Sequence, residues 1–326
     1  MRVVVLHSEV TQGDRKDEDD VLVQVGDVSQ ALSDLGYEPI PMPFSMGIGE
    51  MARKLEDLAP TFVFNLVETV QGAGSLIYLA PAVLDHLAIN YTGASTEAIF
   101  LTSNKIVAKR LLSSSGILTP YWTSIGSIQR GARFNAGTYI VKSVWEHASF
   151  GLDDDALVSV ANPEELLDEL LIRKERLAGD CFAEAFVEGR EFNLSLLAGN
   201  GAPEVLPPAE IMFHDFPETK PRLVGYAAKW EPGSFEYNHT PRRFDFPEED
   251  AGLLRELRGI ALRCWDLFAL RSYARVDFRV DAVGNPWVLE INTNPCLSPD
   301  AGFIAAAAQS GLSFNQVIER IVADSH

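Results

Sequence analysis

YARVDFRV at residues 273–280 and WVLEIN at residues 287–292 flank a short segment, residues 282–285, with the composition of a turn. Polar and apolar residues alternate along both stretches, and this period of two predicts β-strands. The turn between them predicts that the strands pair as an antiparallel hairpin. We therefore expect an antiparallel sheet in the carboxyl-terminal part of the chain.

The hairpin register brings four polar residues onto one face of the strand pair. Centred on the turn, it places Asp277 opposite Glu290 and Arg275 opposite Asn292. Two carboxylates and an amide oxygen are hard ligands, which suit Mg²⁺ better than zinc or copper. Proteins commonly hold Mg²⁺ with one or two carboxylates and substrate phosphates, so a nucleotide is the expected partner. The opposite face is expected to be core, formed by Val276, Phe278, Val280, Trp287, Leu289 and Ile291.

The same four polar residues allow a second interpretation, a solvated strand face with an ordinary Arg–carboxylate ion pair. Polar strand faces of this kind are common. However, an aspartate directly opposite a glutamate is repulsive unless a cation lies nearby. This repulsion favours the metal site over the surface ion pair.

Two lysines earlier in the chain are candidates for binding phosphate. Residues 103–114 are expected to form a helix capped by Ser103, which places Lys105 where free backbone N–H groups favour an anion. Lys142 lies in the apolar strand expected at residues 138–144, where an unpaired charge would be costly. Either lysine alone is more often a structural or surface residue. Together with the acidic hairpin they indicate a nucleotide phosphate site.

The amino-terminal residues alternate between strand-like and helix-like segments. Val3–Leu6 and Thr61–Val67 have the pattern of buried strands, and Val21–Leu35 has apolar residues at helical spacing. This alternation predicts a parallel sheet with crossover helices, that is, a Rossmann-like domain at residues 1–95. Such sheets bind ligands at the carboxyl ends of their strands, which here include the loop at Glu68–Gly74.

Composition excludes several classes of protein. The 326 residues include 27 basic and 46 acidic ones, a net charge of −19 that argues against coating nucleic acid or an anionic membrane. Three distant cysteines without a C-x-x-C pair favour a reducing compartment. No stretch reaches the roughly 18 apolar residues that a membrane span needs. The opening MRVVVLHSEV resembles a strand more than a signal peptide, so we expect a cytoplasmic protein.

A series of short motifs extends from about Phe62 to the C-terminus. They are YTG (91–93), NK (104–105), Lys142, EAFVEGRE (184–191), PAEI (208–211), AKW (228–230), ARVDF (274–278) and EINTNP (290–295). Each alone is weak, but together and in this order they are specific. The chain thereby resembles the ATP-grasp superfamily, and within it the D-alanine–D-alanine ligases.

The resemblance implies a role for each matching residue in binding ATP. Lys105 and Lys142 would contact the nucleotide phosphates. Glu184 and Val187 would line the adenine pocket, mainly through backbone groups, and Glu191 would bind the ribose hydroxyls.

At the reacting end, the resemblance implies that Lys229 approaches the γ-phosphate and that Arg275 stabilises negative charge on the reacting group. Mg²⁺, with Mn²⁺ as a second candidate ion, would be held by Asp277, Glu290 and Asn292. Ser149 is kept from the family loop that closes over phosphates, and Glu68 resembles a glutamate of the family's amino-terminal domain. Lys229 belongs to residues 203–244, which we expect to form a long ordered loop that acts as a lid.

The implied fold is α/β, with the Rossmann-like amino-terminal domain (1–95) followed by a two-lobed ATP-grasp fold. Its central lobe would span residues 96–185 and its carboxyl-terminal lobe residues 186–326. The implied activity is ATP-dependent carboxylate–amine ligation, in which an acyl phosphate forms, an amine attacks it, and an amide, ADP and phosphate result. The implied substrates are small amino acids or peptides, and a homodimer is a further expectation.

Two alternatives to D-alanine–D-alanine ligation stay open. The first is a ligase of the same mechanism for another amino acid or a small peptide. It is favoured by two departures from the family pattern, Cys296 where glycine is usual, and residues 297–300. The second is a nucleotide-binding regulatory protein without ligase activity. The complete metal set argues against it, because loss of activity would be expected to affect Asp277 or Glu290 first.

Overall fold

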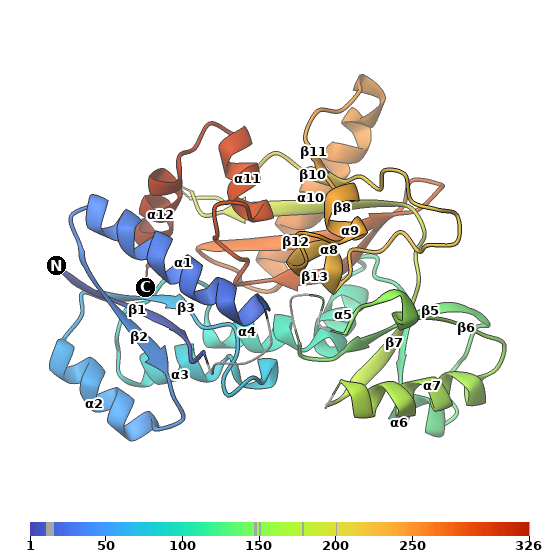
Figure 1. Ribbon diagram of the computed structural model, residues 1–326, viewed down its shortest axis with the longest axis horizontal. Helices are drawn as coiled ribbons and strands as arrows, with labels where there is room; N and C mark the ends of the chain where they lie inside the picture. The colour runs from blue at the N-terminus through green and yellow to red at the C-terminus, as the bar shows by residue number, and fades with distance from the viewer. Residues whose placement is uncertain (11–15, 147–148, 150, 178, 200, 326) are drawn as a thin grey trace.

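The computed structural model describes residues 1–10, 16–146, 149, 151–177, 179–199 and 201–325 (Figure 1). Its amino-terminal part is built on a small sheet in which β1 lies between β2 and β3 and pairs in parallel with both. The predicted parallel sheet with crossover helices is confirmed. The elements are β1 (Arg2–Ser8), α1 (Lys16–Asp34), β2 (Glu38–Phe44), α2 (Ile48–Leu58), β3 (Phe62–Leu66) and α3 (Leu79–His86), with a 3₁₀ turn at Gly74–Leu76.

The middle of the chain forms a four-stranded antiparallel sheet with the order β4-β7-β5-β6. Its elements are α4 (Thr96–Ser103), α5 (Lys105–Ser114), β4 (Trp122–Ser124), α6 (Ile125–Gln129), β5 (Gly137–Ser143), β6 (Leu157–Val160), α7 (Pro163–Arg176) and β7 (Cys181–Ala185), with a 3₁₀ turn at Asp154–Ala156. The predicted cap at Ser103 is wrong, because this residue ends α4. Asn104 caps α5 instead, its Oδ1 accepting the Val107 N–H at 3.0 Å. Lys105 still lies in the first turn.

The carboxyl-terminal part contains a six-stranded sheet with the order β11-β10-β8-β12-β13, and β9 pairs with β8. Its elements are β8 (Arg190–Leu197), β9 (Glu204–Val205), β10 (Ala209–Ile211), α8 (Tyr226–Trp230), α9 (Phe235–His239), β11 (Arg242–Arg243), α10 (Ala251–Leu267), β12 (Tyr273–Val280), β13 (Pro286–Asn292), α11 (Gly302–Gln309) and α12 (Phe314–Ala323), with a 3₁₀ turn at Glu248–Asp250. Residues 203–244 are therefore not one long loop, because they contain β9, β10, α8, α9 and β11. No helix within the described ranges has the length and apolar character of a membrane span.

The predicted hairpin register is confirmed where it decides the site. β12 and β13 pair with Arg275 opposite Asn292 and Asp277 opposite Glu290. A β-bulge then shifts the register, so that Phe278 faces Val288. The prediction that Trp287 and Leu289 belong to the core is wrong, because the extra residue of the bulge puts Val288 there, fully buried.

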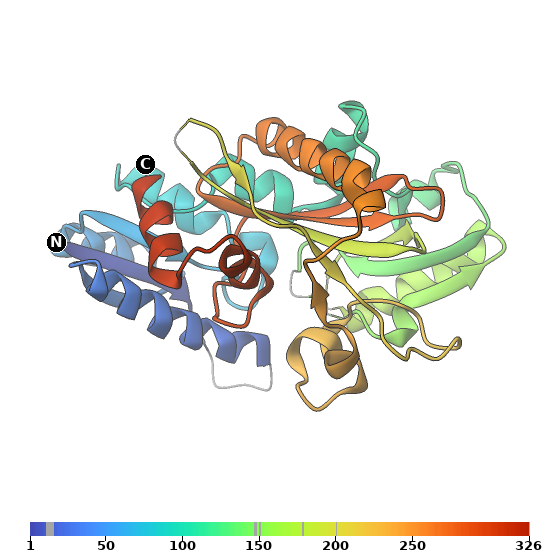
Figure 2. The same cartoon turned by 90° about the horizontal axis from the view of Figure 1, so that it is seen from above.

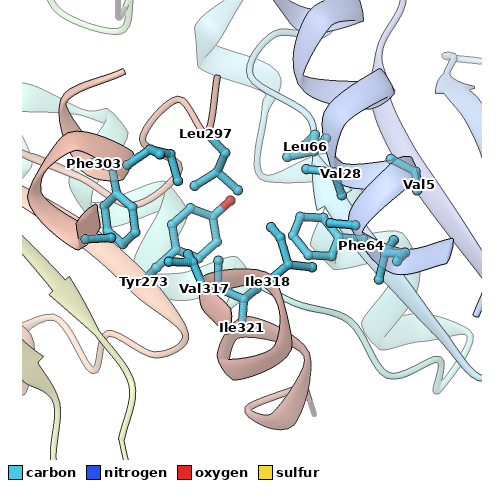
Figure 3. Packing of buried hydrophobic residues seen from close by; sticks show 14 of the residues in the cluster. Val5, Val28, Phe64, Leu66, Tyr273, Leu297, Phe303, Val317, Ile318 and Ile321 are labelled. Atoms are coloured by element: carbon cyan, nitrogen blue, oxygen red, sulfur yellow. The ribbon is translucent and has the colours of Figure 1, made fainter. Parts of the chain in front are cut away.

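One core joins the two ends of the chain. Figure 3 shows Val28 and Phe64 of the amino-terminal part on one side of this core. Ile318 and Ile321, which project from α12, pack on the other side. In both ribbon views α12 lies beside α1 (Figures 1 and 2). Ile318 and Ile321 are fully buried, and burying a side chain of this size contributes about 1.5–3 kcal/mol. The division into segments 1–95, 96–185 and 186–326 stays a proposal, and the carboxyl-terminal helices complete the core of the first segment.

Candidate active site

A pocket lies between the four-stranded and six-stranded sheets. Residues of two other segments complete its walls: Glu146, Ser149 and Leu152 after β5, and Leu223, Val224 and Lys229 in and before α8. The structure brings together in its lining most of the residues expected from the sequence, namely Lys105, Lys142, Ser149, Glu184, Val187, Glu191, Lys229, Asp277 and Glu290. Arg275, Asn292 and Glu68 lie outside the lining, and their positions are described below.

The floor of the pocket contains a buried carboxylate between two lysines. Glu184 on β7 forms ion pairs with Lys142 of β5, at 2.7 Å, and with Lys109 of α5. Burial acts to raise the pKa of Glu184, but the two ammonium groups outweigh it and lower that pKa. The side chain of Lys142 is 14% exposed and reaches the pocket, whereas that of Lys109 is only 1% exposed. The sequence-based expectation that Glu184 acts mainly through its backbone leaves this ion-pair role out.

Lys105 and Lys229 bring two further cations to the pocket from other elements. The Lys105 ammonium donates to the Glu146 carbonyl at 2.6 Å, which orients it from α5 toward the loop after β5. Burial lowers the pKa of Lys105, and burial followed by the nearby Arg275 charge lowers that of Lys229. A desolvated ammonium is costly unless an anion accompanies it. The pocket therefore has the electrostatics of a site for a polyanion.

A second buried carboxylate lies on the neighbouring strand. Glu191 of β8 is opposite Arg279 of β12, and their side chains form an ion pair at 2.8 Å. Burial raises the pKa of Glu191, although the Arg279 guanidinium opposes the shift. Leu289, placed on the pocket side by the bulge, and Phe186 supply apolar wall.

The acidic pair of the hairpin lies at the edge of the pocket. Arg275 holds Asp277 with two hydrogen bonds, Nε to Oδ1 at 2.7 Å and Nη2 to Oδ2 at 2.9 Å, and Asn193 donates to Oδ1 at 2.8 Å. Burial acts to lower the pKa of Arg275, but the Asp277 carboxylate outweighs it and raises that pKa. The ion pair of the alternative interpretation is thus present, but its side chains are only 14% and 9% exposed. The polar face is an inner wall and not a solvated surface.

The donor set of this wall fits a hard divalent cation. Carboxylates from adjacent strands, Asp277 and Glu290, line the pocket together, and each ionised carboxylate oxygen can accept more than one partner. Asn292 follows on β13, with its Oδ1 accepting the Asn294 N–H at 2.9 Å. Among the described residues no three His, Cys, Asp or Glu side chains form a group that could hold a metal ion. Asp277, Glu290 and Asn292 stay the ion ligands expected from the sequence.

The segment that covers the pocket is bonded to the central lobe. The Ser149 hydroxyl donates to the Val224 carbonyl at 3.0 Å, and the Tyr226 N–H donates to the Leu152 carbonyl at 2.9 Å. A Cβ atom on Gly225 would lie 2.4 Å from the same Leu152 oxygen, so only glycine allows this approach. The contacts place Lys229, one turn further along α8, over the pocket.

A separate polar cluster lies next to Arg275, where α1 meets the loop after β13. The Cys296 thiol donates to Asp20 Oδ2 at 3.0 Å, and the Ser298 hydroxyl donates to Asp20 Oδ1 at 2.7 Å. Gln24 donates to Glu68 Oε1 at 3.1 Å, so Glu68 belongs to this cluster. Burial, followed by the charges of Glu68 and Asp20, raises the pKa of Cys296 well above its usual value. This substrate-end cluster comprises Asp20, Gln24, Glu68, Cys296 and Ser298.

Comparison with known proteins assigns this arrangement to a family. The family model described as D-ala D-ala ligase C-terminus matches residues 136–323, more than half of the chain. The chain belongs to the D-alanine–D-alanine ligase family.

Relatives of the family match over nearly the whole chain. A D-alanine–D-alanine ligase of Aquifex aeolicus is 30% identical over 327 residues, which cover 99% of this chain and 100% of that protein. The protein y4sG of Sinorhizobium fredii is 30% identical over 307 residues, or 92% of this chain and 86% of that protein. A crystal structure of D-alanine–D-alanine ligase from Bacillus anthracis complexed with ATP covers 99% of this chain and 96% of its own, with a TM-score of 0.70 and 19% identity. The structural match supports the ATP-grasp fold.

Sequence reasoning missed Lys109, which pairs with the pocket residue Glu184, and Arg279, which lines the pocket. Lys109 lies four residues after Lys105 on the same helix, and this spacing puts both on one face. Arg279 follows Arg275 and Asp277 at alternate positions of β12, so it shares their face. Both signals are present in the sequence. Leu289 could not be found in this way, because the bulge that exposes it leaves no periodic pattern.

Proposed function

We propose that this protein is an ATP-dependent carboxylate–amine ligase that forms an amide through an acyl phosphate and releases ADP and phosphate. D-alanine–D-alanine ligation is the nearest named activity. The observation that carries the proposal is the pocket itself, in which three lysines face a pair of carboxylates on adjacent strands. Polyphosphate needs such cations, and Asp277 with Glu290 suits the Mg²⁺ that accompanies it.

The residues divide the work by position. Lys105 and Lys142 would bind the phosphates of ATP, and Lys229 would reach them from the lid segment. When bound to Asp277, Glu290 and Asn292, Mg²⁺ or Mn²⁺ supplies positive charge that neutralises phosphate oxygens. Glu184, Val187 and Glu191 would face the adenine and ribose.

Arg275 lies between the ion site and the substrate-end cluster. Its guanidinium would stabilise the oxyanion that forms when the amine attacks the acyl phosphate. The two segments joined by the hydrogen bond from Ser149 to Val224 would exclude water, which protects a hydrolysable intermediate. Glu68 would orient the substrate from the amino-terminal side.

A ligase for another amino acid or a small peptide is the second candidate function. It is favoured by Cys296, which stands where the resemblance predicts a glycine. The side chains of Cys296 and Ser298 both donate hydrogen bonds to Asp20. The regulatory alternative is not favoured, because the chain belongs to a family of ligases and the residues proposed to bind the nucleotide line one pocket. We further propose a cytoplasmic location, supported by three free cysteines, and a homodimer.

Phosphate release tests the proposal. The protein is mixed with ATP, Mg²⁺ and a panel of amino-acid pairs that includes D-alanine with itself, and with each amino acid alone. We expect phosphate release and a peptide product for one pair, and neither without a carboxylate substrate. Nucleotide binding with no release across D- and L-amino acids and dipeptides would favour the regulatory alternative.

A further inference from the structure

Arg279 connects several parts of the pocket through one guanidinium. It projects from β12 on the face that carries Asp277, and its side chain is 3% exposed. It forms an ion pair with the Glu191 carboxylate, in which Nη2 lies 2.8 Å from Oε2. In the described part of the chain Oε1 has no hydrogen-bond partner, and Glu191 lines the pocket. Arg279 therefore fixes the carboxylate while leaving one oxygen for a ligand.

The remaining donors of Arg279 bind two backbone carbonyls that belong to different segments. Nη1 donates to the Gly189 carbonyl at 2.9 Å, and Nη2 donates to the Arg222 carbonyl. Gly189 has a φ of 148°, and a Cβ atom there would lie 2.0 Å from the Val280 carbonyl oxygen, so the turn between β7 and β8 lies directly on β12. Arg222 belongs to the segment that covers the pocket.

Aromatic rings complete the surroundings of the guanidinium. Its carbon lies 5.7 Å from the Phe186 ring centroid and 5.5 Å from that of Phe213. Phe186 lines the pocket, whereas Phe213 precedes the covering segment. A planar guanidinium can donate in several directions and lie against rings at once, which an ammonium cannot. The site thus uses properties specific to arginine.

We propose that Arg279 is a positioning residue that orients the Glu191 carboxylate toward the ribose hydroxyls of ATP and couples this contact to closure of the covering segment. The inference rests on the proposed function, because the ribose belongs to the proposed nucleotide. A buried carboxylate paired with a buried guanidinium keeps one orientation, and the hydrogen bonds to Gly189 and Arg222 hold the guanidinium in place. The ribose contact and the closed segment then stabilise each other.

The test compares ATP with 2′-deoxy-ATP, which lacks one ribose hydroxyl, in direct binding measurements with Mg²⁺. Arg279→Met should weaken ATP binding about 10-fold to 100-fold, the range for a lost hydrogen bond to a charged group. It should weaken 2′-deoxy-ATP binding much less, so the preference for ATP falls. Arg279→Lys, which keeps the charge, should retain part of the preference. ATP should also lose its ability to protect residues 213–229 from proteolysis in Arg279→Met.

Arg190→Met is the matched control. Arg190 also projects from a strand of the six-stranded sheet and forms partly buried ion pairs, with Glu210 and Asp250 at 2.8 and 2.7 Å, but it does not line the pocket. The control should keep the wild-type preference between the two nucleotides. If Arg279→Met does not fold, Arg279→Lys decides the question through the same preference and protection measurements.

The wild-type protein separates this inference from the proposed function. If it binds and prefers ATP, but the Arg279 variants keep that preference while both affinities fall equally, Arg279 has only a structural role and the inference is wrong. The proposed function would then stand. If the wild-type protein binds neither nucleotide, the proposed function fails and the inference fails with it.

Discussion

The two ends of the site are built differently. At the nucleotide end, the functional side chains project from paired strands and from the first turns of one helix, and charges of opposite sign are paired. Glu184 with Lys142 and Glu191 with Arg279 are examples. At the substrate end, the cluster around Cys296 joins α1 to the loop after β13, and its groups bond mainly to one another.

This difference suggests a division of roles in the proposed site: the nucleotide end determines the type of reaction, and the other end determines which substrate is used. Strand pairing fixes the nucleotide end, because a residue moved by one position would point to the other face. The substrate end depends on loop residues, which can change without disturbing a sheet. At the proposed nucleotide end the chain has the residues that the resemblance predicts, whereas Cys296 and residues 297–300 depart from that pattern at the proposed substrate end.

The largest effect is expected from the acidic pair. Asp277→Asn or Glu290→Gln should abolish ADP formation, because the ion would lose a carboxylate ligand where phosphate charge must be neutralised. Product formation measured by coupled ADP detection checks this, with thermal unfolding to show that the variants fold. Asp266→Asn, which neutralises an exposed carboxylate on α10 away from the pocket, is the control and should keep the activity. Full activity in both acidic variants would show that the pair is structural.

Arg275→Ala is expected to have the next largest effect. Removing a donor that stabilises an oxyanion typically lowers the rate by about 10²–10³. The loss should appear in the rate of amide formation more than in ATP binding, since Arg275 lies outside the pocket lining. Separate measurements of ATP affinity and turnover check this. An equal loss in both would indicate that the variant has disturbed Asp277.

Replacing the phosphate-facing lysines should have a smaller effect, confined to nucleotide binding. Lys105→Ala and Lys142→Ala should each weaken ATP binding about 10-fold to 100-fold, because each removes a charge-assisted hydrogen bond. Calorimetric titration with ATP provides the measurement. Lys174→Ala, which removes an exposed lysine paired with Asp180, is the control and should change nothing. Unchanged ATP affinity in both pocket variants would remove their phosphate roles.

The pH dependence of ATP binding is a second test of whether the pocket lysines bind phosphate. Burial lowers the pKa of Lys105 and Lys229 below the usual 10.5, so the free protein loses these charges earlier than exposed lysines would. Bound phosphate favours the charged form. Affinity should be highest below the lowered pKa and should fall as the pH rises through it. In Lys105→Arg the fall should shift to higher pH. Affinity that is constant or rises up to pH 10 would contradict this account.

The smallest effect on nucleotide binding is expected at the other end of the site. Cys296→Ala removes hydrogen bonds to Asp20 and from Ser298, each worth about 1 kcal/mol. We expect ATP affinity to change less than about twofold, while the KM of the carboxylate substrate changes by about fivefold to 30-fold, as the loss of one or both bonds implies. Steady-state kinetics with each substrate varied in turn checks this. A larger change in ATP affinity than in substrate KM would mean that the two ends are not independent.

Much of the nucleotide end could be predicted from the sequence, because its residues lie on strands and helices with a regular alternation of polar and apolar side chains. Alternation along two strands was sufficient to place Asp277 opposite Glu290, and the motif order indicated the fold. The residue opposite Phe278 could not be predicted. One extra residue in β13, at the bulge, turns the β13 residues before it to the opposite face from the one that alternation predicts. Lys109 was missed for another reason, namely that its partner Glu184 is distant in sequence.

The substrate end was the least predictable part. Asp20 and Cys296 are separated by almost the whole chain, and their contact depends on how α1 meets the loop after β13. The packing of α12 against α1 sets that meeting, and no local pattern encodes it. Residues 203–244 were expected to be one loop, because their elements are too short for a periodic signal.

The most direct test of the account is the identity of the activated intermediate. Hydroxylamine is added in place of the amine, together with ATP, Mg²⁺ and the carboxylate substrate found in the panel. We predict that a hydroxamate accumulates in step with ADP and phosphate, because in the proposed site the γ-phosphate would face the lysines and the acidic pair while the carboxylate would approach from the Arg275 side. Formation of AMP and pyrophosphate would instead show an acyl adenylate, and it would contradict the proposed mechanism.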